Sequence, residues 1–375
     1  MTDDAVEISS LSWEYRLVAA VVYAVEQRAG GAAAGARTRW NGRLVEEQDP
    51  DFVGSAEEDG SLSVSVAQVL EPLRRARDLD RPLTDDEAWE LRDAFATLTH
   101  EAAHLLARFG DPDAPDAHPF DDASEADNEG RTEHWTHRNL DAVVLAVFPD
   151  AGLEHAQEAV LSQVNDDAYA AYTTAARQLD QALAERSGLT SAEVTQKLMC
   201  ADDVQRWNVA VDLVIDERLG KPGLMPEAHR AEVREALIAP LRASLADLVA
   251  VEADESLSDD EKSAESEQAA QNAIAGLDHE LDRIERRYRV EKAQRAQQQA
   301  GRPGTRRTQA VRQAQDRLSP DLERLRAVTS GQAPAAGATS RSAEAVDHAQ
   351  QGPNDGSRGR QAPGRASGPR GPGVG

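Results

Sequence analysis

The sequence contains little sulfur and few aromatic side chains, and each shortage narrows the class of protein. One of its 375 residues is cysteine, Cys200, so an internal disulfide framework is excluded and a reducing, cytoplasmic location is expected. Cys200 follows Leu198 and Met199 in an apolar run, which predicts a packing role and not a nucleophile. Aromatic residues make up 4% of the chain while alanine is abundant, a composition that favours helices packed through small side chains.

The sequence also lacks a long apolar run and a basic segment near its N-terminus. Its longest apolar run, residues 17–25, is bounded by charges and is too short to span a bilayer. The first residues include Asp3, Asp4 and Glu7, with no basic segment before an apolar one, so no secretory signal is expected. The formal net charge is −26 at pH 7, which predicts that nucleic-acid backbones repel the chain as a whole.

Residues 97–106 read TLTHEAAHLL and contain the pattern His-Glu-x-x-His. A capping box at Thr84–Glu87 predicts a helix that runs to Phe109, with Gly110 just past its end. Two histidines four residues apart then share one helix face, so His100 and His104 can bind the same metal ion. The glutamate of the pattern lies about 100° further round the helix, where its carboxylate can reach a metal-bound water.

The surroundings of this pattern resemble the extended consensus of zincin metallopeptidases. The matching features are a threonine before the first histidine, uncharged residues between the histidines and apolar residues after them: Thr97, Ala102, Ala103, Leu105 and Leu106. The resemblance implies a zinc-dependent peptidase in which His100 and His104 bind Zn²⁺ and Glu101 is the general base. Ala107 and Gly110 stand where a metzincin would have a glycine and a third histidine, so that class is excluded.

A third protein ligand is expected, because a catalytic zinc site uses three protein ligands and keeps one open position. A helix is predicted from Glu129 to Phe148, after a loop at 111–128 with three prolines. Residues 127–135 resemble the segment in which gluzincins, such as the aminopeptidase N family, place a glutamate ligand. The resemblance implies Glu129 as the third ligand. That family separates the second histidine from its glutamate by about 18 residues. Here 24 residues intervene, so three alternatives stay open: Glu133, His118 and Asp127.

The zincin resemblance has two further implications for the site. Zincins place a short sheet beside the site helix, and its edge strand holds an extended substrate. Leu62, Val64 and Val66 alternate with serines in residues 61–67, which predicts a half-buried strand. That strand is the candidate for the edge strand, with a structural hairpin arm as the alternative. The ring that stabilises the oxyanion is expected from the later helices, and four candidates stay open: Tyr169, Tyr172, His134 and His137.

The C-terminal part of the chain differs from the rest in composition. A charged helix is predicted within 259–299, with apolar residues three and four apart: Ile274, Leu277, Leu281, Ile284 and Tyr288. This seam predicts either a coiled coil, for self-association or a partner helix, or packing against the same chain. From residue 301 on there are 12 Arg against six acids, among many glycines and prolines. We expect a disordered, solvated tail, with contact to nucleic acid as the weaker alternative.

The spacing of apolar residues as a whole predicts a mainly α protein with a small β element. We expect a zincin-like metal-binding domain, a helical domain, a charged helix and a basic low-complexity tail, at residues 1–150, 151–252, 253–300 and 301–375. The function predicted is that of a zinc metallopeptidase acting on a peptide or protein substrate. The alternative is an interaction or scaffold protein, either zincin-like without catalysis or simply all-helical.

Overall fold

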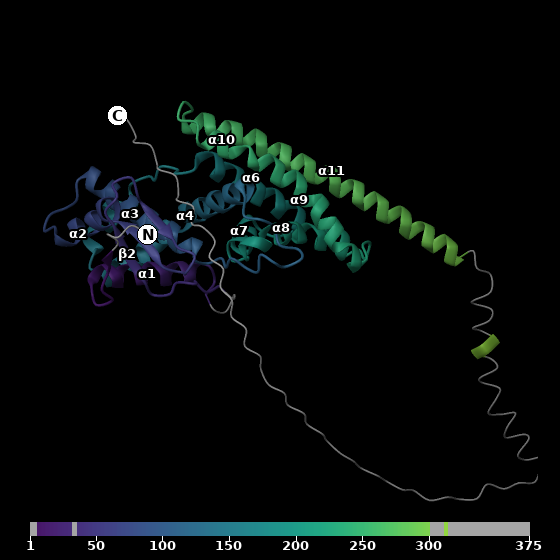
Figure 1. The fold of residues 1–375 in the computed structure, drawn as a ribbon, viewed down its shortest axis with the longest axis horizontal. Coiled ribbons are helices and arrows are strands. Elements are labelled where there is room, and N and C mark those ends of the chain that lie inside the picture. Colours follow the sequence, from purple (N-terminus) through teal and green to yellow (C-terminus); the bar gives the residue numbers. More distant parts are fainter. Residues whose placement is uncertain (1–5, 32–35, 301–310, 314–375) are drawn as a thin grey trace, which may run out of the picture. The chain divides into compact units, whose positions relative to one another are not determined.

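A computed structural model describes residues 6–31, 36–300 and 311–313 (Figure 1). Within these residues the chain is mainly helical and carries one small sheet, as the apolar spacing predicts. None of the described helices combines the length and the apolar character needed to cross a membrane. The basic tail expected from residue 301 lies outside the described residues, apart from 311–313.

The short strands all lie within residues 6–65, with one helix between the first two, and helices make up most of the described residues that follow. The strands are β1 Val6–Glu7, β2 Leu44–Glu47, β3 Gly54–Ala56 and β4 Leu62–Ser65. The α-helices are α1 Trp13–Arg28, α2 Glu71–Asp78, α3 Asp85–His104, α4 Asp122–Ala151, α5 Gln157–Leu161, α6 Ala170–Ser187, α7 Ser191–Met199, α8 Arg206–Ile215, α9 Arg230–Ala246, α10 Leu248–Glu252 and α11 Asp259–Ala300. Short 3₁₀ or π segments are η2 Val66–Leu70, η3 Glu154–Ala156, η4 Asp203–Gln205, η5 Asp216–Gly220 and η6 Glu227–His229.

The sheet has the strand order β1-β2-β4-β3, with β2 and β4 parallel and the two outer pairs antiparallel. The strand predicted at 61–67 is therefore present as β4, but two expectations about it are wrong. It is an inner strand and not an edge strand, and it is buried on both faces, since Ser63 and Ser65 are buried as well. The edge strand beside α3 is β3. Gly54 permits this contact, because a Cβ there would lie 2.9 Å from Cγ2 of Thr97.

The first hydrophobic core lies among the sheet, α1, α3 and the C-terminal half of α4. Leu17 and Val21 of α1 lie one turn apart and are fully or almost fully buried here. The rings of Phe95 in α3 and Phe148 in α4 have centroids 4.9 Å apart and join the two helices. Cys200 is partly buried against this core, and burial raises the pKa of its thiol, in agreement with a packing role.

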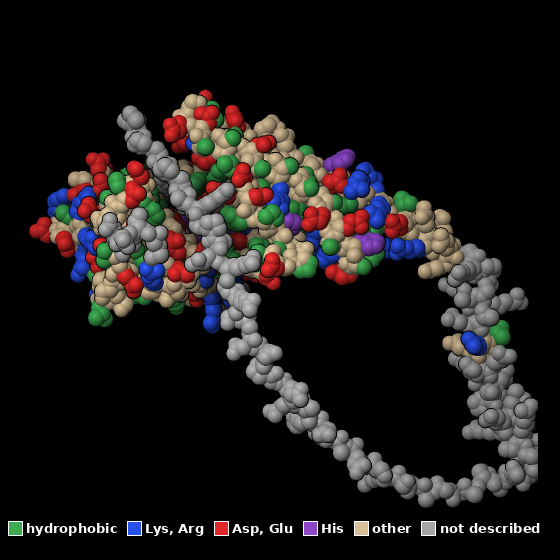
Figure 2. Space-filling model, viewed as in Figure 1, with side chains coloured by type: hydrophobic (Ala, Val, Ile, Leu, Met, Phe, Trp, Pro, Cys, Tyr) green, Lys and Arg blue, Asp and Glu red, His purple; other side chains and the backbone are tan. Residues whose placement is uncertain are grey.

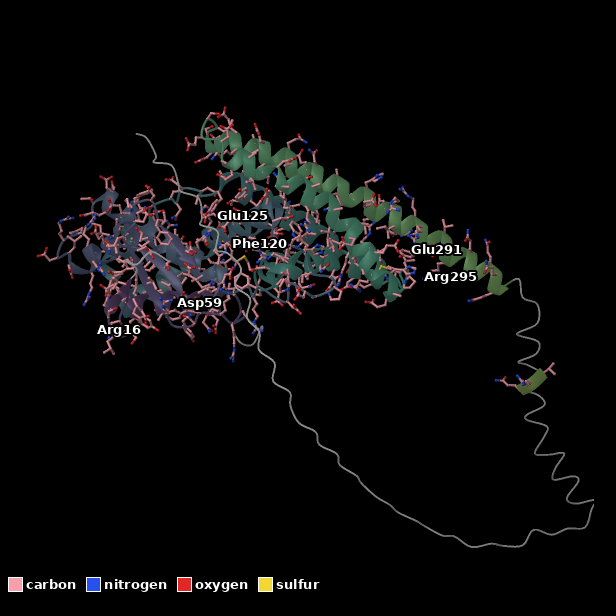
Figure 3. The ribbon with its side chains drawn as sticks, in the orientation of Figure 1. Arg16, Asp59, Phe120, Glu125, Glu291 and Arg295 are labelled. Carbon is pink, nitrogen blue, oxygen red and sulfur yellow. The ribbon has the colours of Figure 1, made fainter. Side chains whose placement is uncertain are left out.

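A second hydrophobic core joins the N-terminal end of α4 to α6, α8, α9 and α11. The predicted apolar seam of α11 is buried in it, with Leu277, Leu281, Ile284 and Tyr288 at most 3% exposed. Of the two alternatives for the seam, packing against the same chain is therefore the one found. A capping box of Ser258 and Glu261 starts α11. Beyond Arg289 the helix carries further charges, among them the half-buried Glu291 and the exposed Arg295, which pair at 3.2 Å (Figure 3).

The surface that covers these two cores is rich in charge of both signs. On the face drawn in Figure 2, acidic side chains are interspersed with arginines and lysines and do not form one broad acidic area. Several exposed or half-buried arginines form ion pairs with two or more acidic side chains. Arg230 and Arg234 are examples, and both pair with Asp212. Local pairing therefore offsets part of the repulsion that a net charge of −26 would produce.

The ends of the two site helices differ from the sequence expectation. The capping box of Thr84 and Glu87 starts α3 as predicted, but α3 ends at His104 and not at Phe109. The following carbonyl groups are bound instead by Arg39, whose backbone N–H donates to Leu105 at 2.8 Å and whose Nε donates to Ala107 at 3.2 Å. Likewise α4 starts at Asp122 and not at residue 129, with the side chain of Asp121 as its N-cap. Residues 122–128, expected in the loop, are helical.

Helices α4 and α6 approach each other closely at Gly130. A Cβ at this position would lie 2.2 Å from the carbonyl oxygen of Tyr172 and 2.8 Å from its Cβ. The next residue, Arg131, is buried and pairs with Asp127 one turn earlier on α4 and with Asp180 of α6. Steric fit and a buried ion pair thus fix the position of α6 against the N-terminal half of α4.

This close contact yields a test of the fold. Gly130→Ala should reduce the free energy of unfolding by about 1–3 kcal/mol or more, because overpacking against backbone atoms cannot be relieved by moving a side chain. Urea unfolding at 25 °C measures the difference. Gly220→Ala is the matched control, since a Cβ there would meet neighbours at an ordinary 3.7 Å. Equal stability of wild type and Gly130→Ala would contradict the contact.

Candidate metal centre

Helices α3 and α4 bring three potential metal ligands together. His100 and His104 lie on the last two turns of α3, and Glu129 lies in the second turn of α4. Nε2 of His100 is 3.0 Å from Nε2 of His104 and 3.2 Å from Oε2 of Glu129. The third side of this triangle, from Nε2 of His104 to Oε2 of Glu129, is 3.3 Å. The three side chains predicted as ligands therefore converge on one point.

The size of this triangle suits a zinc ion. With zinc–ligand bonds of about 2.0–2.1 Å in a tetrahedron, two ligand atoms lie about 3.3 Å apart. The three separations of 3.0, 3.2 and 3.3 Å match that length without movement of the helices. The imidazole and carboxylate donors are ligands that zinc accepts. The side chains of His100, His104 and Glu129 are 8%, 12% and 22% exposed, so the Glu129 side is the more open one.

The longer spacing between His104 and Glu129 is absorbed locally. The 24 intervening residues consist of the loop 105–121 and residues 122–128 of α4. Because α4 starts early, Glu129 projects from a well-formed helix, which holds a ligand more rigidly than a loop would.

The three alternatives for the third ligand have other partners. Glu133 approaches His100 from the opposite side, with Oε2 2.7 Å from Nδ1. Asp127 pairs with Arg131, and His118 lies 3.3 Å from Oδ1 of Asn208 and 3.1 Å from Nη1 of Arg242. Among the four residues considered, Glu129 is the one whose carboxylate contacts Nε2 of both histidines.

Glu133 orients the ring of His100. Burial would lower the pKa of His100, but hydrogen bonds with Glu129 and Glu133 outweigh burial and hold that pKa well above its usual value. Burial would likewise raise the pKa of Glu133, yet its bonds to His100 and His137 hold it below the usual range. A carboxylate that accepts from Nδ1 leaves Nε2 facing the other ligands, which is the arrangement that supports metal-binding histidines.

The ring of His104 is held by α4 and α8. The hydroxyl of Thr132 is 3.4 Å from its Nδ1, and the side-chain nitrogen of Asn128 is 3.2 Å away. Arg206 fixes the amide of Asn128 by donating to its Oδ1 at 2.7 Å. With Nε2 turned to a cation, the proton of the ring resides on Nδ1 and the Thr132 oxygen is its acceptor, while the Asn128 nitrogen, itself a donor, contacts Nδ1 without a hydrogen bond.

Glu101 lies apart from the three converging atoms, as its position on the helix predicts. It is half-buried and adjoins strand β3, where a Cβ on Gly54 would be 3.0 Å from its Cγ and 3.3 Å from its Oε1. Its negative charge acts on His100, which places it near the histidine pair. The carboxylate thus stands beside both the potential metal ligands and the edge strand.

The four candidate rings for oxyanion stabilisation lie in different surroundings. Tyr169 stacks on His100 with ring centroids 5.8 Å apart, and Tyr172 stacks on Tyr169 at the same separation. His137 contacts Glu133 at 3.1 Å, and burial lowers the pKa of His134 to about 4. Tyr169 is the candidate in contact with a converging ligand.

Sequence reasoning missed a second group of potential ligands beside the first. Glu133, His137 and Asp167 place one ligand atom each within 4.8 Å of one another. The spacing of Glu133 and His137, four residues apart on α4, is visible in the sequence. Asp167 comes from the segment before α6, and no local pattern points to it.

Comparisons of the chain with protein-family models, with curated proteins and with solved structures return no match. The residues and their geometry therefore carry the functional argument alone.

The contact between Glu133 and His100 can be tested by metal affinity. Glu133→Gln should weaken the binding of the first zinc equivalent about 10–100-fold, because the amide is a poorer acceptor for Nδ1–H than the carboxylate. Competition with a chromogenic chelator gives the affinity. Asp150→Asn, an exposed change on the same helix, is the control and should leave it unchanged. Unaltered affinity in Glu133→Gln would show that this contact does not support the metal ligand.

Proposed function

We propose that the protein is a zinc-dependent, gluzincin-like metallopeptidase. The observation that carries the proposal is the convergence of His100, His104 and Glu129, whose ligand atoms lie 3.0–3.3 Å apart. Three protein ligands with one more exposed side are typical of a catalytic zinc centre, whereas structural centres close all four positions with protein side chains. The zincin-like consensus around the histidines points to the same class of enzyme.

A zinc ion held by these residues would supply Lewis acidity toward a water molecule and a substrate carbonyl group. The side chains of the protein have the remaining roles. His100, His104 and Glu129 hold the cation, while Glu133 keeps Nε2 of His100 directed at it. Glu101 takes a proton from the attacking water and passes it to the nitrogen of the leaving amine, so its carboxylate ends each cycle as it began.

A peptide is the substrate class that the surroundings favour. Strand β3 is at the edge of the sheet, paired with β4 on one side, and it adjoins Glu101 through Gly54. An edge strand offers backbone N–H and C=O groups with which an extended peptide can pair. Because Gly54 has no side chain, a peptide held along β3 would pass close to the carboxylate of Glu101.

The roles of ligand and base can be separated by substitution. Glu101→Gln should retain stoichiometric zinc but lower the rate of peptide hydrolysis by at least about 10²-fold, because the amide cannot accept the proton. His104→Ala should lose the zinc of this centre together with the activity, because one of its three ligands is gone. Metal analysis and digestion of a peptide library, with circular dichroism to verify folding, measure these outcomes.

Glu90→Gln is the matched control, since it removes a carboxylate from the same helix where Glu90 forms an exposed pair with Arg75. It should bind zinc and cleave peptides as wild type does. A wild-type protein that binds zinc yet cleaves no peptide in the library would favour the interaction protein without catalysis. A wild-type protein that binds no zinc would exclude both the peptidase and the zinc-binding scaffold.

A further inference from the structure

Behind the first centre lies a second set of imidazole and carboxylate groups, on the far side of Glu133 from His100. Oε1 of Glu133 is 3.1 Å from Nε2 of His137, one turn later on α4. Asp167 adds its carboxylate from the segment that joins α5 to α6, and one ligand atom of each residue lies within 4.8 Å of the others. The set combines one imidazole with two carboxylates, and these come from α4 and from the segment before α6.

From this arrangement we infer that Glu133, His137 and Asp167 form a second site for a divalent transition-metal cation. One imidazole and two carboxylates are a donor set that Zn²⁺ and Mn²⁺ accept. The two carboxylates match the charge of a divalent ion. His137 is 29% exposed, whereas the ligands of the first centre are at most 22% exposed, so we expect weaker binding. This inference does not depend on the peptidase proposal, because it concerns different ligands.

Each of the three ligands is oriented by a neighbouring group. The backbone N–H of Ala168 donates to Oε1 of Glu133 at 3.2 Å, and the ring of His137 also hydrogen-bonds the backbone of Asp166. Asp167 accepts from the hydroxyl of Thr173 at 2.8 Å and from the backbone N–H of Tyr169 at 3.1 Å. Supporting hydrogen bonds of this kind fix ligands before the metal binds, and they distinguish this set from a group of exposed acids.

A cation at this site would connect α4 to the segment before α6. That segment includes Tyr169, the ring that stacks on His100 of the first centre. Binding of the cation by Asp167, two residues earlier, would therefore restrain Tyr169 at the first centre. The second site would act as an anchor for this ring and not as a second reaction centre.

Counting bound zinc tests the inference. The full chain, stripped of metal with a chelator, is dialysed against increasing Zn²⁺ and the bound metal is measured. Wild type should bind two equivalents, the second more weakly. Asp167→Asn should keep the first and lose the second, with at least about a 10-fold loss of affinity. Asp166→Asn is the matched control, because it removes the adjacent charge while keeping the backbone. This variant should bind two equivalents of zinc.

A second variant and a second readout guard against misfolding. His137→Gln alters the most exposed ligand, whose side chain is 29% exposed, and should also lose only the weaker equivalent. In a His104→Ala background, excess Zn²⁺ should still raise the melting temperature, because a ligand that binds only the folded state stabilises it. Adding Asp167→Asn to that background should abolish the rise.

Three results would overturn the inference. One is a wild-type protein that takes up a single equivalent and loses it in His104→Ala, and another is an Asp167→Asn isotherm equal to that of wild type. The third is loss of both equivalents in a folded Asp167→Asn protein, since Asp167 would then act on the first centre and not on a separate one.

Discussion

The packing of α3 and α6 on α4 depends on one constraint. The ionisable side chains that α4 carries into the interior must each meet a partner that offsets their charge. Asp127, Glu129, Arg131 and Glu133 all lie within the N-terminal half of this helix, where an unpaired buried charge would be costly. Helix α6 supplies Asp180 to Arg131, while α3 supplies His100 and His104 to the two glutamates. The requirement that every one of these groups has a partner therefore fixes α3 and α6 on either side of α4, and the same contacts assemble the candidate metal centre.

Features set by neighbouring residues were predictable from the sequence, and features set by distant ones were not. The capping box of α3 and the shared face of His100 and His104 follow from local spacing, and both are present. The predicted end of α3 was wrong because Arg39, which binds the carbonyl groups beyond His104, is far away in the sequence. The edge strand was misplaced for a similar reason. The alternation in β4 suggested one buried face, but β2 and β3 on either side bury both.

The third ligand shows how far sequence reasoning reaches at a site. Glu129 and Glu133 are both glutamates and lie one turn apart, so their spacing in the sequence leaves both open as the third ligand. The structure separates them by the ring nitrogen that each meets: Glu129 lies at Nε2 of His100 and Glu133 at Nδ1. That distinction depends on the orientation of α3 relative to α4, which no local pattern encodes. Asp167 was missed on the same grounds, since it reaches Glu133 and His137 only through the packing of the α5–α6 segment on α4.

The surroundings of the centre also bear on the choice between an enzyme and a metal-binding scaffold. A scaffold needs ligands that hold the cation, and closure of all four positions would serve it best. Here the Glu129 side is the more exposed one, and a carboxylate that is not among the converging ligands, Glu101, lies near enough to His100 for its charge to act on that ring. A glycine brings an edge strand against that carboxylate. The exposed side, the additional carboxylate and the adjoining edge strand do not strengthen metal binding. Hydrolysis of a peptide, in contrast, needs an open metal position, a general base and a surface that binds the substrate peptide. Their coincidence at one end of α3 is what favours catalysis.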